Sequence, residues 1–202
     1  MGIIGVVAAL TLPNLNSSTG DREKVAKVKK IYSNLQDAYG RATAVYGPID
    51  EWPTEIYGSF ATLKEKNLSE RLTEFMKISK DYGNNKEYIL ADGTCIYIYI
   101  AYIAASQYYS GAKYVGIIDV DIDGKNKGKD AYGYDRFVFD ITDQGIYPEG
   151  LADNDLTSQC FVEGYCTRWV IENGNMDYLK VGSDGKCPDG KTNLSWTNTT
   201  CK

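Results

Sequence analysis

The sequence predicts an α+β fold in which one long N-terminal helix packs against an antiparallel β-sheet, with a disulfide-tied C-terminal loop region. Three observations carry this prediction. A helical apolar stripe runs toward residue 46, strand-like segments joined by short turns follow over 86–147, and four cysteines fall within 150–202. A helix followed by a run of neighbouring strands is typical of α+β folds.

The N-terminal helix is predicted over 2–46. In its amphipathic part, 21–46, apolar residues recur in steps of three and four, which is the spacing of one buried helix face. The stripe consists of Val25, Val28, Ile31, Leu35, Ala38, Ala42 and Val45. Gly47 and Pro48 end the helix, and Pro13 with the polar residues after it predicts a bend or local melting at 13–20.

Shorter elements follow the long helix. Residues 59–76 predict one or two short helices. Over 86–147 four strands and a short fifth are expected, joined by short turns that indicate an antiparallel meander. Asp92-Gly93 is a strong hairpin signal, and the run Ile96–Ile103 is expected at the centre of the sheet, because an apolar edge strand promotes aggregation.

The C-terminal region, 150–202, is predicted as loops with one strand at 167–174. Disulfides explain its cysteines better than a zinc site, because the chain has no CxxC pair and no histidine. The candidate disulfide cysteines are Cys160, Cys166, Cys187 and Cys201, which allow three pairings, of which nearest-neighbour pairing is the simplest. The fifth cysteine, Cys95, lies in an apolar run and is predicted to be a buried free thiol.

Composition limits the function classes. The chain has 202 residues and a net charge of −5, which argues against nucleic acid as a partner. The absence of histidine excludes Ser-His-Asp and Cys-His catalysis and histidine-ligated zinc. One stretch, 22–30, is basic, and two interpretations stay open: a solvated helix face, or a contact with anionic lipid headgroups.

An acidic segment at 119–130 matches the calcium-loop pattern D-x-D-x-D-G. We predict a weak Ca²⁺ site there, since alternate carboxylates at the end of a strand converge on one side. The candidate ligands are Asp119, Asp121, Asp123 and Asp130. The alternative is a strand with a solvated acidic face that runs into a Lys/Gly turn, and three lysines in the loop favour this alternative because they oppose a dication.

The chain opens with an apolar run, Ile3–Leu12, that ends at Pro13. As a helix this run reaches only about 15 Å, half of the ~30 Å hydrocarbon core of a bilayer. No basic residue precedes it, so it is not a secretory signal peptide. We interpret it as the end of a longer apolar helix, and we expect the sequence to begin part-way along that helix.

The segment IIGVVAALTLPNL resembles the N-terminal helix of type IV pilins and of the pseudopilins of type II secretion systems. KVKKIYSNLQDAYGRA is similar to the amphipathic half of that helix, and the 119–139 loop and CTRWVIENGNMDYL resemble the family more loosely. The resemblance assigns a membrane and filament role to residues 1–20, and a globular pilin-like domain to 21–202. The implied helix positions are Ile3, Ile4, Val6, Val7, Leu10, Leu12 and Pro13.

The resemblance implies a structural role without catalysis. Subunits of this family are held in the bacterial inner membrane, carry a periplasmic or extracellular globular domain, and bundle their apolar helices in a filament core. The implied partners are other copies, other pilin-like subunits, the inner membrane and the secretion or pilus assembly machinery. Calcium at a loop beside the sheet supports folding in such pseudopilins, which adds weight to the predicted Ca²⁺ site.

Two other functions stay open. A membrane-tethered module could bind carbohydrate or another surface through the tyrosines and tryptophans of 150–202. A histidine-free hydrolase working through carboxylates is the remaining alternative, but no feature singles out a pair among the 27 acidic residues.

Overall fold

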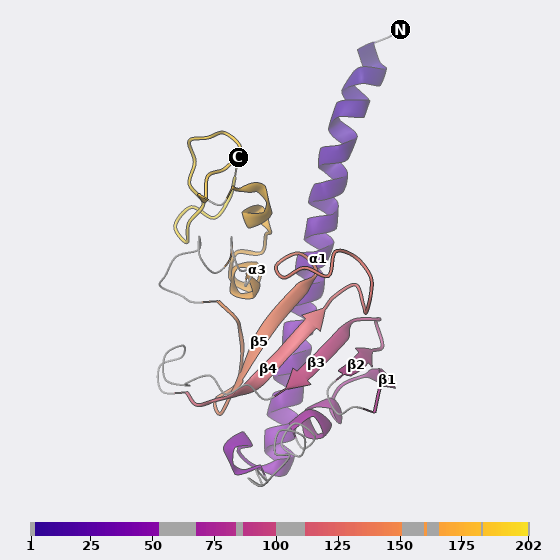
Figure 1. Cartoon of the computed structure of the whole chain (residues 1–202), viewed down its shortest axis with the longest axis vertical. Helices are drawn as coiled ribbons and strands as arrows, with labels where there is room; N and C mark the ends of the chain where they lie inside the picture. The colour runs from indigo at the N-terminus through magenta and orange to yellow at the C-terminus, as the bar shows by residue number, and fades with distance from the viewer. Residues whose placement is uncertain are drawn as a thin grey trace.

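The chain folds as a long helix on one face of a six-stranded sheet, with a C-terminal region beside the helix (Figure 1). The computed structural model describes residues 3–52, 68–83, 87–99, 112–150, 160, 166–182 and 184–201, with the backbone alone at 3–18 and at residue 50. The predicted α+β class and the predicted antiparallel sheet are confirmed.

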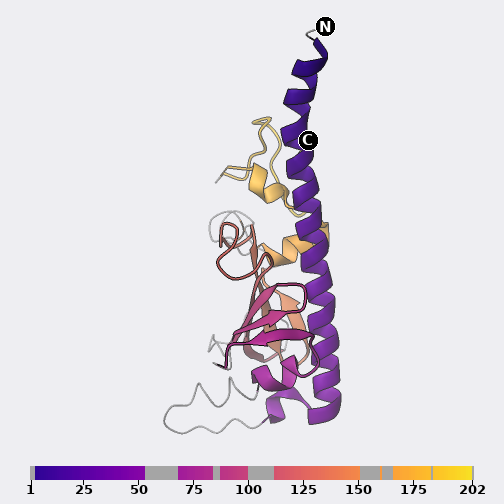
Figure 2. The same cartoon turned by 90° about the vertical axis from the view of Figure 1, so that its right-hand side faces the viewer.

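Helix α1 spans Ile3–Tyr46 as one helix of 44 residues. The backbone stays helical through 13–20, without the local melting that Pro13 and its polar neighbours predicted. The C-terminal half of α1 lies along the sheet, while its indigo N-terminal part extends beyond the sheet (Figures 1 and 2). A 3-10 turn, η1 (Ile49–Glu51), follows, and Trp52 Nε1 donates to Gly47 O at 2.9 Å.

The sheet is an antiparallel meander in which each strand pairs with the next along the chain. Its strands are β1 (Ile78–Asp81), β2 (Glu87–Leu90), β3 (Cys95–Tyr99), β4 (Tyr114–Asp121), β5 (Arg136–Thr142) and β6 (Ile146–Pro148), in that spatial order. The hairpin predicted at Asp92-Gly93 joins β2 to β3. Of the run Ile96–Ile103 expected at the centre of the sheet, 96–99 lies in the central strand β3, and 100–103 lies outside the described residues.

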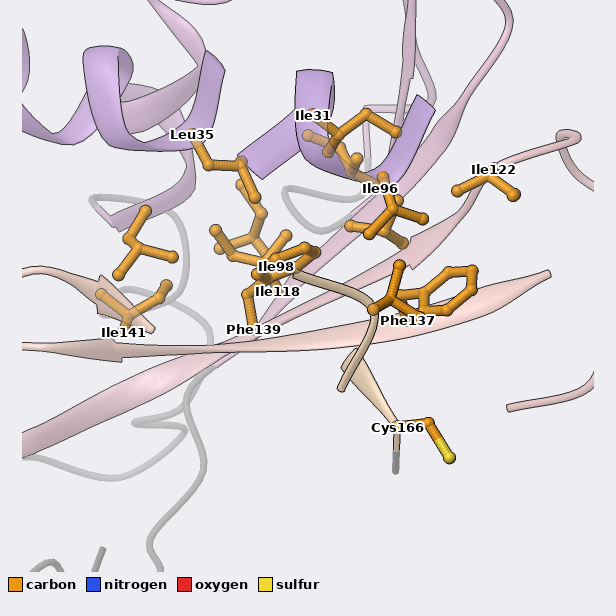
Figure 3. Packing of buried hydrophobic residues seen from close by; sticks show 14 of the residues in the cluster. Ile31, Leu35, Ile96, Ile98, Ile118, Ile122, Phe137, Phe139, Ile141 and Cys166 are labelled. Atoms are coloured by element: carbon orange, nitrogen blue, oxygen red, sulfur yellow. The ribbon is translucent and has the colours of Figure 1, made fainter. Parts of the chain in front are cut away.

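The core lies between α1 and one face of the sheet. Six of the seven predicted stripe residues of α1 are buried, and only Val45 is wrong, because it is 62% exposed. Figure 3 shows Ile31 and Leu35 of α1 above Ile98, Ile118 and Phe139 of the central strands. Tyr32 adds a stacked contact with Phe139, with the two ring centres 5.6 Å apart.

Two predicted elements differ from the structure. Of the helices expected over 59–76, a short helix is present at 68–73, and 59–67 lies outside the described residues. The segment predicted as a strand at 167–174 forms helix α3 (Thr167–Asn173), which ends at Gly174 in the left-handed conformation with φ 65°. A 3-10 helix, η3 (Asp177–Lys180), follows it.

The cysteines of the C-terminal region pair with their nearest neighbours along the chain. Cys160 bonds to Cys166, with Cα atoms 4.6 Å apart, and Cys187 bonds to Cys201, with Cα atoms 5.5 Å apart. Cys95 is a free, fully buried cysteine on β3, as predicted.

Candidate functional site

The amphipathic half of α1 is fixed to the sheet by polar contacts as well as by its apolar stripe. Gln36 Nε2 donates to Ile146 O at 2.7 Å and to Tyr32 Oη at 2.8 Å. Tyr39 Oη donates to Thr142 O at 3.1 Å. These bonds set the rotation of α1 over β5 and β6, so the apolar stripe has one register on the sheet.

The N-terminal positions with a predicted membrane and filament role all lie in α1. They are Ile3, Ile4, Val6, Val7, Leu10, Leu12 and Pro13, and their side chains fall outside the described residues. Within the part of the chain that the structure describes, no helix is both long and apolar enough to cross a bilayer.

The four predicted calcium ligands do not converge on one point. Asp119, on β4, forms an ion pair with Arg136 and accepts a hydrogen bond from Tyr132 Oη at 2.9 Å. Asp130 contacts the same guanidinium, with its Oδ1 3.2 Å from Arg136 Nη1. Arg136 thus draws Asp119 and Asp130 into an ion-pair network and takes the place that a cation would need.

The other two candidates, Asp121 and Asp123, lie side by side at the start of the β4–β5 loop. Asp121 is only 3% exposed, and its Oδ1 accepts a hydrogen bond from Gly124 N at 3.0 Å. Burial, with a side-chain hydrogen bond to Asp123, raises the pKa of Asp121 to about 6. Asp123 Oδ1 is buried and has no hydrogen-bond partner. The predicted solvated acidic face is therefore wrong for Asp119 and Asp121, which are both buried.

A buried carboxylate that sequence reasoning missed organises the β4–β5 loop. Asp135 has no exposed surface and accepts backbone hydrogen bonds from Lys129 N, Asp130 N and Ala131 N, at 2.5, 3.0 and 2.6 Å. The loop can wrap this carboxylate because Gly128 (φ 66°) and Asp130 (φ 52°) adopt left-handed backbone conformations. The succession of glycines in the loop is the sequence signal that could have indicated it.

Among the residues that the structure describes, no group of three or more carboxylates, cysteines or histidines could hold a metal ion. Calcium binding stays a prediction, now restricted to Asp121 and Asp123. A titration of the melting temperature with Ca²⁺, with Asp123→Asn as the comparison variant, measures it directly.

The outer face of the sheet carries a second polar cluster. Glu87, on β2, is buried and forms an ion pair with Lys125 of the β4–β5 loop, at 2.5 Å between Oε1 and Nζ. Lys125 Nζ also lies 4.5 Å from the ring centre of Tyr82. This contact ties the β4–β5 loop to the β1–β2 edge of the sheet.

An open groove of about 390 Å³ runs along the exposed side of α1. Lys30, Asn34, Asp37 and Arg41 form the helix wall, and 74–77 and 90–92 form the opposite wall. Phe75 contributes an apolar surface, but positive and negative side chains alternate around the rim. The groove therefore shows no preference for a ligand of one charge.

Trp169 and Trp196 of the C-terminal region pack in or against the hydrophobic core that α1 and the sheet share. Trp169 is 1% exposed, and its ring centre lies 5.1 Å from that of Trp196. Trp169 Nε1 donates to Asn175 Oδ1 at 3.0 Å. These two tryptophans support the fold and do not form an exposed platform for a sugar ring.

Known proteins give no guide to this arrangement. No protein-family model, no curated protein and no solved structure matches the chain. The resemblance to pilins thus rests on the residues quoted for it, and the function has to be argued from the fold itself.

Proposed function

We propose that this chain is a structural, non-enzymatic subunit of a pilin-like filament, either a type II secretion pseudopilus or a type IV pilus. The observation that carries the proposal is α1. One continuous helix of 44 residues has a half that is docked on the sheet and an N-terminal part that extends beyond the sheet (Figure 2). A helix of this kind can bundle with its copies while the sheet stays on the outside.

The charge pattern of α1 supports this assembly mode. The first ionisable side chain along the chain is Asp21, so the extending part of α1 carries no charged side chain. The sequence of this part, Ile3–Leu12, is almost entirely apolar, and apolar segments of this kind are typical of interaction or membrane surfaces. We infer that this part is held in the bacterial inner membrane before assembly and packs against neighbouring subunits afterwards.

The packing of the C-terminal region also favours a structural role over a surface-binding module. Both disulfides and the Trp169–Trp196 contact stabilise this region internally. Disulfides persist in oxidising compartments such as the periplasm, in agreement with the proposed placement of the globular domain.

Site-specific photo-crosslinking of the full-length protein in the cells that produce it tests the proposal. A photoreactive residue at Val7 or Leu10 is expected to yield a ladder of multimers, because helix-to-helix contacts repeat along a filament. The matched control places the same residue at Tyr82, which is 39% exposed on the far edge of the sheet. Equal yields of multimers from all three positions, or none from Val7 and Leu10, would contradict assembly through α1.

A further inference from the structure

Two basic segments that are far apart in the sequence meet beside one aromatic ring. Lys24 Nζ, from α1, lies 3.2 Å from the ring centre of Tyr134, and Lys129 Nζ, from the β4–β5 loop, lies 3.9 Å from the same centre. The two distances place the ammonium groups within about 7 Å of each other. Lys27 follows one turn along α1, and Lys127 belongs to the same loop as Lys129. We call these four residues the lysine cluster.

The lysine cluster has no carboxylate within ion-pair distance among the described residues, although Lys27 interacts electrostatically with Asp92. None of its four members forms an ion pair with a carboxylate of the described residues. The acidic groups nearby are Asp21 and Glu23 on α1, Asp92 on the β2–β3 turn, and Asp123, Asp130 and Asp135 in the loop. Asp92 pairs with Lys30, Asp130 with Arg136, and Asp135 accepts three backbone N–H groups. An anion bound beside Lys24 and Lys129 would reduce the repulsion between their two ammonium groups.

The lysine cluster lies at the end of the sheet that faces the N-terminal part of α1. Both views show the β4–β5 loop at this end, beside α1 (Figures 1 and 2). At about 1.5 Å per residue, Lys24 lies only about 6 Å along the helix from Gly20, where the uncharged part of the chain ends. The cluster is therefore next to the segment that the proposed function places in a membrane.

We propose that the lysine cluster binds the phosphate headgroups of anionic phospholipids at the membrane surface. This inference rests on the proposed function, because the uncharged part of α1 supplies the position beside the bilayer. Screened electrostatic attraction acts over about 8 Å at physiological ionic strength, so charges near Gly20 remain within range of the headgroups.

Two lysines of the C-terminal region have carboxylate partners, unlike Lys24 and Lys129. Lys180 pairs with Asp177 at 2.5 Å, and Lys186 approaches Asp184 at 3.8 Å. Their charges are offset locally, whereas Lys24 and Lys129 stand over an aromatic ring with no carboxylate between them.

Partitioning of the full-length chain into vesicles tests the inference. Binding is measured to phosphatidylcholine alone and to phosphatidylcholine with about 30% phosphatidylglycerol, at about 0.1 M and about 0.5 M salt. The test variant is Lys24→Gln with Lys129→Gln. The matched control is Lys77→Gln with Lys80→Gln, two exposed lysines at the far edge of the sheet. Thermal melts verify that both variants are folded.

The wild type and the control are expected to prefer the anionic vesicles, and to lose that preference at high salt. Each lysine near an anionic surface adds about fivefold to binding, so the test variant should lose up to about 25-fold of the preference. An equal preference in the test and control variants overturns the inference. The inference is also overturned if the test variant keeps its preference for anionic vesicles but loses the crosslinked multimers of the photo-crosslinking experiment. An acidic neighbouring copy would then be the partner of the lysine cluster.

The outcomes separate this inference from the proposed function. Binding to neutral vesicles with no gain on anionic ones leaves the membrane role of α1 intact and overturns the lysine cluster as a lipid site. Binding only to anionic vesicles, dependent on Lys24 and Lys129, supports the cluster and contradicts insertion of α1. No binding to any vesicle overturns both.

Discussion

At the scale of single residues, the β4–β5 loop depends on carboxylates that are held out of solvent. Asp119 is stabilised by Arg136, and Asp135 by three backbone N–H groups. Hydrogen bonds to a charged acceptor are stronger than neutral ones, so these contacts fix the loop. Space for them exists only because the chain contains a glycine at position 128.

Gly128→Ala should destabilise the protein strongly. A Cβ at this position would overlap with carboxylate oxygens of Asp123 and Asp135, in addition to the strain of φ 66°. We expect a loss of about 3 kcal/mol in the free energy of unfolding, measured by chemical denaturation. Gly190→Ala is the matched control, because Gly190 has φ 67° but open space around it, and it should cost about 1 kcal/mol. Equal losses would show that overlap at Gly128 has no effect.

Asp121 should make the stability fall as the pH rises from about 4 to about 6. Its pKa is raised from an ordinary value of 3.8 to about 6 in the folded protein, so the folded state binds more protons than the unfolded state in this window. Below about pH 4 the Asp121 carboxyl is protonated in both the folded and the unfolded state, and above about pH 6 it is ionised in both. The raised pKa thus corresponds to a loss of about 3 kcal/mol in the free energy of unfolding as the pH rises through this window.

Asp121→Asn should remove this dependence, because the amide stays neutral and can still accept from Gly124 N. Denaturation at a series of pH values should then give a flatter curve and a more stable variant at pH 7. Asp37→Asn, at a side chain that is 66% exposed, is the control and should retain the wild-type slope. A wild-type slope in Asp121→Asn would contradict the buried carboxyl pair as the cause.

At the scale of elements, the long segment with strong periodicity was predicted well, whereas some short segments were predicted wrongly or missed. The stripe of α1 was predictable because one long helix repeats the same signal several times. The prediction of burial is wrong for Val45 because the last turn of the helix extends past the end of the sheet (Figure 1). β1 was missed since only Ile78 in it is even partly buried, so an edge strand of this kind carries no alternation.

Helix α3 shows how a local signal can be misread. Valine and isoleucine at its centre favour a strand by propensity. Yet Cys166, Trp169 and Val170 are all buried, at positions i, i+3 and i+4, and Gly174 closes the helix. Tertiary packing decided the outcome, since Thr167 Oγ1 accepts a hydrogen bond from Val138 N on β5 at 2.9 Å.

The candidate sites show the same contrast between local patterns, which were predicted, and contacts between distant residues, which were not. The aspartates of the β4–β5 loop were found from their spacing, but their partners were not. Arg136 and Asp135 lie in or next to the following strand, and sequence spacing does not reveal which carboxylate an arginine will choose. Only the part of the lysine cluster within the basic stretch 22–30 was recognised from the sequence. The proximity of Lys24 to Lys129 depends on how the loop folds back on α1.

At the scale of the whole molecule, the C-terminal region relies on covalent ties. Cys187 and Cys201 enclose a loop with a sequence separation of 14 that has few regular hydrogen bonds. Cross-linking such a loop restricts the unfolded chain and stabilises the fold by about 3 kcal/mol. The tie also holds the chain end in place, where Cys201 N donates to Asp177 Oδ2 at 2.8 Å.

Replacing Cys187 and Cys201 together by serine should lower the melting temperature by about 5–10 °C, since about 1 kcal/mol corresponds to 2–4 °C in a chain of this size. Cys95→Ala is the control for loss of a buried cysteine without loss of a disulfide. Strong reductant should lower the melting temperature of the wild type and of Cys95→Ala by the same amount, and that of the double variant by less. If reductant leaves the wild-type melt unchanged, packing on the shared core holds the C-terminal region without its disulfides, and the region does not depend on an oxidising compartment.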